Sequence, residues 1–364
     1  MKILIPVLNF GKSGGYRVLS KIADELGNLG HTVDFMSPEI SLLPYYPTFA
    51  AIKWIDSDGR IINREKKDPV INESGISIFR ILTKGLKKIS RDQYDVIIAN
   101  QSLTTFAIKL AGLTHQTLYY VQAYEPDIYI ILGGFKNWLL CQITKFSYKM
   151  KLFTVVNADI YLDYKNLKAS RVLYPGIDFN NFYYASKKSE DENELIIGTI
   201  GRIEPLKGTR YVVEAFKALK KRYPKLTLHI AFGNADDFSD CDGIKCCQLH
   251  SDKELGNFYR SLDYYICAGY SQFGAFHYPV AEAMSCGVPL ITTYYYPANE
   301  NNSWLVSPQS VKDIVKIFEM AYNERELGIA KIKQGLTDVK MLEWRFVGER
   351  LNNYINEFVN NKKK

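Results

Sequence analysis

The residues best suited to chemistry are two cations in the segment TIGRIEPLKGTRYVVEAF, residues 199–216. An apolar run ends at Gly201, Arg202 follows it directly, and Lys207 lies five residues later, where a helical pattern starts. Both side chains can converge on one anionic group, to which a helix N-terminus adds partial positive charge. A diphosphate leaving group fits this arrangement, because its developing charge needs fixed donors. Each cation alone is compatible with a solvated surface charge, but the pair, flanked by Gly201 and Gly208, predicts an anion site.

A second candidate site is GAFHYPVAEAMSCGVPLITT, residues 274–293. A glycine-containing loop leads through Pro279, which suits the first turn of a helix, into a short helix that ends at Gly287. Glu282 lies about one turn inside that helix, where its carboxylate can accept hydrogen bonds from a ribose diol. The alternative is a carboxylate that only stabilises the helix N-terminus.

The first apolar run leads into a glycine-rich loop, ILIPVLNFGKSGGYRVL at residues 3–19. Its Gly-Lys-Ser matches the end of a phosphate-binding P-loop, but Pro6 stands where the P-loop has its first glycine and offers no N–H. Gly14 and Gly15 follow at the start of a helical pattern. We therefore predict that this loop of the first domain faces a ligand-binding cleft, where its backbone approaches a phosphate or an acceptor closely.

Short apolar runs alternate with helical patterns, which predicts parallel sheets with crossover helices. The polar stretch SKKSEDENE at 186–194 interrupts this rhythm. We predict an α/β protein of two Rossmann-like, doubly wound domains that face each other across a cleft, over 1–185 and 195–339, with 186–194 as linker and a helix over 340–361 returning to the first domain. Strands are expected at 2–7, 32–37, 94–100, 117–122, 152–156, 171–175, 195–201, 226–233, 244–250, 263–269 and 288–293, and helices over 208–222, after a capping box at 251–254, and from 279.

The bulk composition limits the class of protein. A net charge of +7 favours anionic partners such as nucleotides, phosphorylated lipids or a membrane surface, without requiring nucleic acid. None of the six cysteines forms a C-x-x-C pair, which predicts neither a zinc site nor a disulfide framework and favours a reducing, cytosolic compartment. No signal peptide and no apolar stretch near the ~20 residues of a membrane span is predicted. We expect a cytoplasmic protein, soluble or peripheral.

Together, GRIEPLKG at 201–208 and PVAEAMSCGVP at 279–289 resemble the motifs of retaining glycosyltransferases of the GT-B fold, specifically family 4, the glycosyl transferases group 1. The likeness covers nearly the whole chain, with YPGIDFNNF at 174–182 and Trp344 as further matches. The resemblance implies a first domain that binds an acceptor, a second domain that binds a nucleoside-diphosphate sugar, and no metal or other cofactor.

The same resemblance implies roles for single residues. Arg202 and Lys207 would hold the departing diphosphate, beside Gly201, and Glu282 would bind the donor. The acceptor hydroxyl would attack from the side of the leaving group, and a donor phosphate oxygen would take its proton.

One departure from the family pattern concerns the donor sugar. The family's first glutamate falls at Gly274 here, and His277 stands where the family usually has glycine. Without that carboxylate, the backbone amides of Ala275 and Phe276, or the His277 ring, are expected to contact the sugar. A donor sugar that lacks the usual hydroxyl, such as a deoxyhexose, fits this site.

The segment YYVQAYEPDIY at 119–129 follows a predicted strand and resembles a branch of the family that includes bacterial rhamnosyltransferases. Gln122, Tyr124 and Glu125 are candidate contacts to the acceptor or the reacting centre. Alternatively, Glu125 only opens the loop that follows.

The segment IILGGFKNWLLCQITKFSYKMK at 130–151 mixes four lysines with aliphatic and aromatic residues. It is either a buried helix with a solvated lysine face, the commoner arrangement, or a basic amphipathic helix that lies on an anionic membrane. The basic stretch KGLKKISR at 84–91 favours the second interpretation.

We therefore expect a retaining, metal-independent glycosyltransferase that moves a hexose or deoxyhexose from a nucleotide sugar to a growing, lipid-linked cell-surface glycan such as O-antigen or capsule, at the inner face of the plasma membrane. Two other functions stay open. A GT-B epimerase or hydrolase needs an acid/base pair, for which Glu125 and His277 are the candidates. A non-catalytic sugar-nucleotide-binding partner of another transferase is favoured by Gly274 in place of glutamate.

Overall fold

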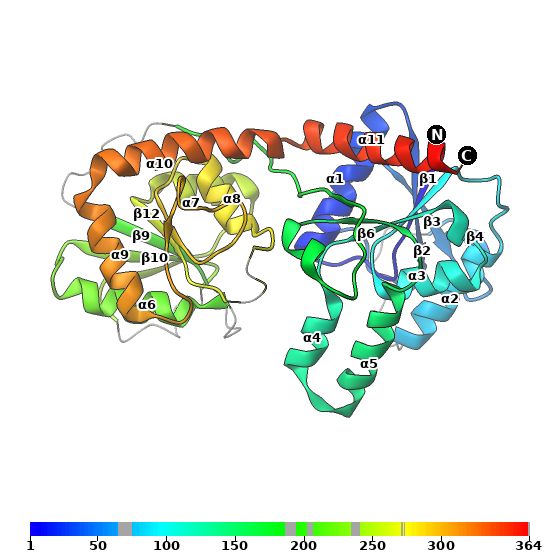
Figure 1. Ribbon diagram of the computed structural model, residues 1–364, viewed down its shortest axis with the longest axis horizontal. Helices are drawn as coiled ribbons and strands as arrows, with labels where there is room; N and C mark the ends of the chain where they lie inside the picture. Colours follow the sequence, from blue (N-terminus) through cyan, green and yellow to red (C-terminus); the bar gives the residue numbers. More distant parts are fainter. Residues whose placement is uncertain are drawn as a thin grey trace. The chain divides into compact units, whose positions relative to one another are not determined.

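The computed structural model describes residues 1–64, 75–185, 194–201, 207–233, 241–270, 272 and 274–362. The chain divides into two compact units: unit 1 comprises Met1–Gly176 and Trp344–Lys364, and unit 2 comprises Ile177–Glu343 (Figure 1). Each unit is built on one β-sheet with helices, which confirms the predicted α/β class. The expected linker, apart from Glu194, lies outside the described residues.

Unit 1 contains an eight-stranded sheet in the order β4-β3-β2-β1-β5-β6-β7-β8, parallel except for the pair β3–β4. Its strands are β1 (Lys2–Pro6), β2 (Thr32–Pro38), β3 (Ala51–Ile55), β4 (Ile61–Ile62), β5 (Val96–Ala99), β6 (Thr117–Val121), β7 (Phe153–Val156) and β8 (Arg171–Val172). Its helices are α1 (Gly14–Asn28), α2 (Gly75–Lys87), α3 (Ser102–Leu110), α4 (Glu125–Leu132), α5 (Gly134–Ser147) and α11 (Trp344–Asn361), with short 3-10 turns at Thr114–Gln116 and Asp159–Asp163.

The predicted helices and strands of unit 1 form because packing against one another buries their apolar residues. The apolar face predicted for α1 is buried against the sheet, and α2 and α3 cover the other face of the sheet (Figure 1). The closing helix begins at Trp344, after a 3-10 turn over Val339–Leu342, so the predicted helix 340–361 is two elements. α11 packs on α1, and Arg171 pairs with Glu357 at 2.5 Å.

Unit 2 contains a six-stranded sheet in the order β11-β10-β9-β12-β13-β14, with every pair parallel. Its strands are β9 (Leu195–Ile200), β10 (Leu226–Ala231), β11 (Ile244–Cys247), β12 (Tyr264–Cys267), β13 (Leu290–Thr292) and β14 (Trp304–Leu305). Its helices are α6 (Thr209–Lys220), α7 (Asp252–Ser261), α8 (Tyr278–Ser285), α9 (Val311–Asn323) and α10 (Arg325–Asp338). Half of the capping box predicted at the start of α7 is present, since the backbone N–H of Glu254 donates to Ser251 Oγ at 3.2 Å. The Glu254 carboxylate accepts from the backbone N–H of His250 at 2.9 Å rather than from that of Ser251.

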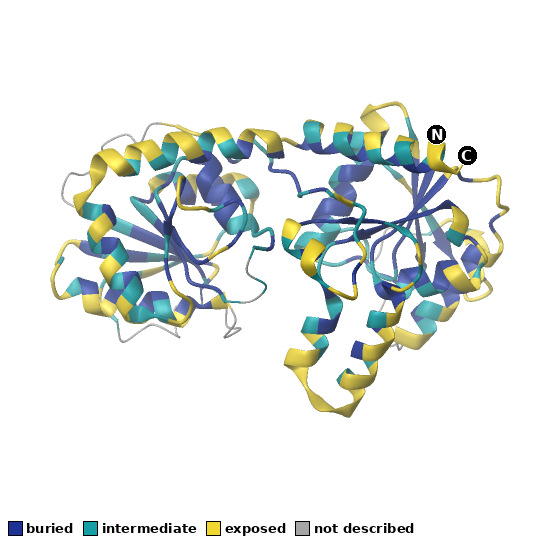
Figure 2. Ribbon diagram, viewed as in Figure 1, coloured by how far each residue is buried: buried dark blue, intermediate teal, exposed yellow. Residues whose placement is uncertain are grey.

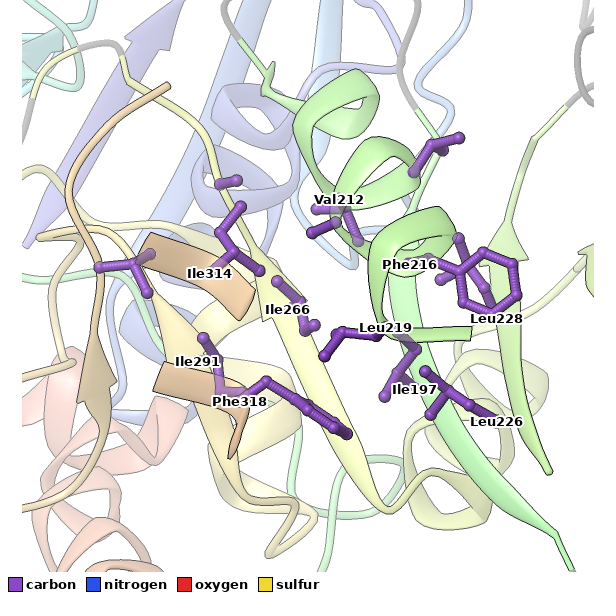
Figure 3. Packing of buried hydrophobic residues seen from close by; sticks show 14 of the residues in the cluster. Ile197, Val212, Phe216, Leu219, Leu226, Leu228, Ile266, Ile291, Ile314 and Phe318 are labelled. Carbon is purple, nitrogen blue, oxygen red and sulfur yellow. The ribbon is translucent and has the colours of Figure 1, made fainter. Parts of the chain in front are cut away.

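A continuous apolar core fixes this sheet. Figure 3 shows Ile197 of β9 and Ile266 of β12 packed under Phe216 and Leu219 of α6, and Phe318 of α9 extends the same layer. α7 and α8 pack against each other, and α8 packs on β12 and β13. The chain leaves β9 through α6 toward β10 and later returns to β12 on the other side of β9. The carboxyl ends of β9 and β12 therefore form the switch point where ligands of such sheets bind.

Candidate functional site

The first candidate residues lie at the switch point of unit 2. Arg202 lies outside the described residues, whereas Lys207 is described and exposed, immediately before α6. The hydroxyl of Thr209 donates to the carbonyl of Ile200 at 3.1 Å, which ties the first turn of α6 to the end of β9. Lys207 is thus held beside a helix N-terminus at the carboxyl edge of the sheet, a favourable position for an anion.

Two glycines allow neighbouring backbone segments to approach each other closely at this edge of the sheet. Gly208 caps α6 with a φ of +78°, and a Cβ atom there would overlap the carbonyl oxygen of Ala268, just beyond β12. A Cβ at Gly201 would lie 2.7 Å from the Cα of Gly233, beyond β10. Gly201 and Gly208 are therefore required by the packing between neighbouring strand ends, and this packing also sets the position of Lys207.

His277 lies at the same edge. Its Nδ1 is 3.9 Å from Sγ of Cys267, the last residue of β12, and its ring stacks on Tyr295 with centroids 4.5 Å apart. Burial raises the pKa of the Cys267 thiol, while the nearby Lys207 acts to lower it. Cys267 and Tyr295 were not predicted. Cys267 lies in a predicted strand near its end, but nothing local distinguishes Tyr295 within its aromatic run.

The backbone of the segment before α8 is largely committed. Gly274 has a φ of +82°, a conformation that a glutamate would adopt only under strain. The amide of Ala275 donates to the carbonyl of Gln272 at 3.0 Å, so the amide expected to contact a sugar already closes a turn. Phe276 bridges to Tyr296 in parallel register. The two hydrogen bonds of this bridge use the amide of His277, which donates to the Tyr296 carbonyl, and the carbonyl of Ala275, which accepts from the Tyr296 amide, so the bridge does not use the Phe276 amide.

Glu282 occupies α8, whose first turn contains Pro279 as predicted. Its side chain is 2% exposed and accepts a hydrogen bond from the Tyr259 hydroxyl at 3.3 Å. Burial and the Glu282 carboxylate raise the pKa of Tyr259 well above its ordinary value. In this arrangement Glu282 is bonded to α7, and its predicted contact with a ribose stays a prediction.

In unit 1 the structure brings together loops that follow three strands. Gly14 and Gly15 begin α1, and a Cβ at Gly15 would lie 3.3 Å from Gln122 Oε1, just beyond β6. Tyr16 hydrogen-bonds Gln101, which follows β5. The predicted residues Gly15 and Gln122 are therefore neighbours at the carboxyl edge of this sheet.

Tyr124 and Glu125 lie at the start of α4, which they connect to α3 and α5. Tyr124 is buried and its ring stacks on Tyr148 of the α5 C-terminus, with centroids 5.4 Å apart. Glu125 begins α4 and accepts a hydrogen bond from the backbone N–H of Ser102 at 2.7 Å, and burial raises its pKa. Both residues thus join α4 and α5 to the rest of unit 1, away from the contact between Gly15 and Gln122.

The raised pKa of Glu125 predicts a pH effect on stability. Between the ordinary value of 4.5 and the raised value, the folded state binds the proton more tightly than the unfolded state, so the free energy of unfolding falls as pH rises. Each tenfold change in proton affinity is worth about 1.4 kcal/mol. Glu125→Gln keeps an acceptor for Ser102 and is expected to make this decline shallower in urea unfolding curves measured across that pH range.

The control for this prediction is Glu349→Gln, because Glu349 is exposed on α11 and its replacement removes the same charge. Equal pH dependence of the free energy of unfolding in both variants would contradict the prediction. Glu125→Ala, by contrast, leaves the Ser102 amide without this acceptor. It should lower the free energy of unfolding by about 1–3 kcal/mol.

Comparison with known proteins adds to this geometry. Residues 194–323, which contain the Lys207 edge and α8, match the family model of glycosyl transferases group 1. An uncharacterised glycosyltransferase of Haemophilus influenzae is 21% identical over 341 residues, covering 90% of this chain and 92% of that protein. Sucrose-phosphate synthase of Thermosynechococcus elongatus has a similar fold, with a TM-score of 0.74 and 15% identity over 99% of this chain and 100% of that chain.

A further solved structure, Anabaena HepE in complex with UDP-glucose, has a TM-score of 0.70 and 14% identity over 98% of this chain and 100% of that chain. At these identities the solved structures establish the fold, which is that of the GT-B glycosyltransferases. Residues 194–323 are thus similar to the glycosyl transferases group 1, and nearly the whole chain shares the GT-B fold.

Proposed function

We propose that the protein transfers a sugar, with retention of configuration, from a nucleoside-diphosphate donor to an acceptor. The observation that carries this proposal is the position of Lys207 beside the N-terminus of α6, at the edge of unit 2 where Gly208 packs against the end of β12. The family match over residues 194–323 includes this edge, and the related fold of Anabaena HepE holds UDP-glucose.

In the proposed reaction the bond from the sugar's anomeric carbon to the diphosphate breaks, and a bond from that carbon to the acceptor oxygen forms. The acceptor proton passes to a donor phosphate oxygen. Arg202, Lys207 and the α6 N-terminus stabilise the negative charge that develops on the diphosphate, which is the role a metal ion fills in other transferases. We therefore propose that the reaction needs no metal.

The donor sugar in this proposal is a deoxyhexose, of the kind that the rhamnosyltransferase branch transfers. Gly274 supplies no carboxylate to bind a sugar hydroxyl, and the partly exposed His277 ring, which stacks on the buried Tyr295, is the side chain proposed to contact the sugar in its place. The acceptor in this proposal is a lipid-linked glycan reached at the cytoplasmic face of the membrane, with Gly15 and Gln122 among its contacts in unit 1.

Thermal stabilisation by UDP, GDP, TDP, CDP and ADP, each with EDTA, tests the donor site. A ligand at a hundredfold its dissociation constant adds about 2.7 kcal/mol to the free energy of unfolding, which raises the melting temperature visibly. We expect one diphosphate to stabilise the wild type without metal and Arg202→Ala to abolish the effect. If none stabilises the protein, or if only ATP with magnesium does, the proposed function is wrong.

A further inference from the structure

Helices α4 and α5 form a hairpin that projects from the sheet of unit 1 (Figure 1). Gly133 and Gly134, with φ of +63° and +81°, reverse the chain between them, and no atom approaches within 4 Å of the Cβ position of either glycine. The segment 130–151 is therefore not one helix. The expectation of a buried helix is also wrong, because residues 130–136, 138 and 139 at the end of the hairpin are exposed (Figure 2).

The exposed end carries large apolar side chains. We define the apolar tip as Ile130, Ile131, Leu132, Phe135, Trp138 and Leu139, all of which are exposed. Phe135 is 80% exposed and its ring stacks on Trp138, with centroids 5.9 Å apart. Soluble proteins rarely leave such a contiguous apolar patch in water unless it binds a partner or a membrane.

The charge around the tip indicates which partner covers it. Residues 128–158 contain no aspartate or glutamate and four lysines, Lys136, Lys145, Lys149 and Lys151. Lys136 is exposed within the tip. Lys145 lies close to Asp127, and Lys149 and Lys151 are exposed just beyond α5 at the base of the hairpin, about 20 Å along the helix from the tip. Two copies of this surface would bring like charges together, but anionic lipid headgroups complement both the lysines and the apolar tip.

The base of the hairpin is fixed. Phe146 of α5 stacks on Phe106 of α3 with centroids 6.4 Å apart, and Ser147 Oγ donates to Ser102 Oγ at 3.0 Å. Glu125 accepts from the Ser102 amide on the α4 side. Because α3 starts directly after Gln101, the hairpin is tied to the loops that contain Gly15 and Gln122 rather than hanging free.

We propose that the α4–α5 hairpin docks the protein on an anionic lipid bilayer, with the apolar tip inserted among the headgroups and Lys136 on a lipid phosphate. Trp138 suits this position, since tryptophan is enriched at membrane–water interfaces. In the described part of the chain, no helix has the length and hydropathy of a membrane span, so contact through the hairpin is peripheral. The inference deepens the proposed function, because it names the surface through which a lipid-linked acceptor is reached.

Co-sedimentation of the full chain with vesicles tests the docking. The vesicles contain either phosphatidylcholine alone or equal amounts of phosphatidylcholine and phosphatidylglycerol. We expect binding to the anionic vesicles only, weakened by salt. Each lysine near the surface contributes about 1 kcal/mol, a factor of about five in the partition coefficient. Lys136→Gln should therefore weaken binding about fivefold, and Phe135→Ser with Trp138→Ser should reduce it at least as strongly.

Matched controls exist in unit 2. Leu327 and Ile329 are exposed apolar residues of α10, and Lys312 is an exposed lysine of α9, so L327S/I329S and K312Q make equal chemical changes elsewhere. Both controls should bind anionic vesicles like the wild type. The proposal is overturned if the wild type stays in the supernatant, or if F135S/W138S binds as tightly as L327S/I329S. A wild-type dimer that F135S/W138S dissociates, without vesicle binding, would instead assign the tip to a second copy.

The vesicle assay needs no nucleotide, so docking and donor binding can fail separately. The stabilisation of F135S/W138S by the selected diphosphate should equal that of the wild type. Vesicle binding without any diphosphate effect would refute the proposed transferase and leave the docking surface in place. Stabilisation by a diphosphate without vesicle binding would refute the docking surface and leave the proposed transferase in place.

Discussion

Replacement of Lys207 with alanine is expected to lower kcat for sugar transfer by a factor of about 10²–10³, the loss typical of one fixed donor to a developing charge. Lys207 is exposed beside the N-terminus of α6, where its ammonium group can meet a departing diphosphate. Because this charge develops in the transition state, kcat should fall more than the affinity for the donor. The rate is measured as nucleoside diphosphate released, with a lipid extract of the source cell as acceptor.

Lys217→Ala is the matched control, since Lys217 lies near the other end of α6 and pairs with Glu214 at 3.2 Å. Its loss removes the same charge from the same helix and should leave kcat unchanged. Lys207→Arg, which keeps a cation, is expected to retain part of the rate. Equal turnover by Lys207→Ala and Lys217→Ala would remove Lys207 from the proposed mechanism.

Gly208→Ala is expected to reduce the free energy of unfolding of unit 2 by about 3 kcal/mol. The left-handed φ of +78° costs a non-glycine residue about 1–2 kcal/mol, and the overlap with the Ala268 carbonyl adds an overpacking cost of about 1–3 kcal/mol. For a unit of this size the melting temperature should fall by about 10 °C. Calorimetry resolves whether the loss falls on the transition of unit 2.

The control for this variant is Gly27→Ala in α1, where an added Cβ meets no atom within 4 Å. Alanine is favoured over glycine in a helix by about 1 kcal/mol, so Gly27→Ala should leave the melting temperature unchanged or raise it. An unchanged melting temperature in Gly208→Ala would mean that α6 does not need its close approach to β12.

The order of strands and helices was largely predictable because the signals are local. The apolar runs predicted as strands formed β1, β2 and β5 to β13, although β8 keeps only Arg171–Val172 of the predicted 171–175. A short buried strand of a parallel sheet has an uninterrupted apolar sequence, which makes it easy to predict. The capping box at Ser251 and the proline at 279 each placed a helix start. β3 and β14 were missed because β3 is only partly buried near a sheet edge and β14 has two residues.

The hairpin shows where local signals fail. The segment 130–151 has the composition of a buried helix, and its Gly133-Gly134 pair was not enough to predict the reversal. Whether Phe135 and Trp138 are buried depends on what packs over them, and that depends on the whole fold. The structure leaves them exposed, which excludes a core helix and supports the proposed surface that binds lipid.

The sequence by itself determined the α/β fold. It was also enough to propose an anion site at the edge with Lys207, because Lys207, Gly208 and the helix that follows are contiguous. Only the tertiary structure decided which distant residues meet there. Strand order places Cys267, His277 and Tyr295 together, and it places Gln122 beside Gly15. Tyr124 and Glu125 adjoin Gln122 in sequence but are directed inward, because the chain turns into α4 at Glu125. Which residues become neighbours depends on how the whole chain packs, and no short stretch of sequence specifies that packing.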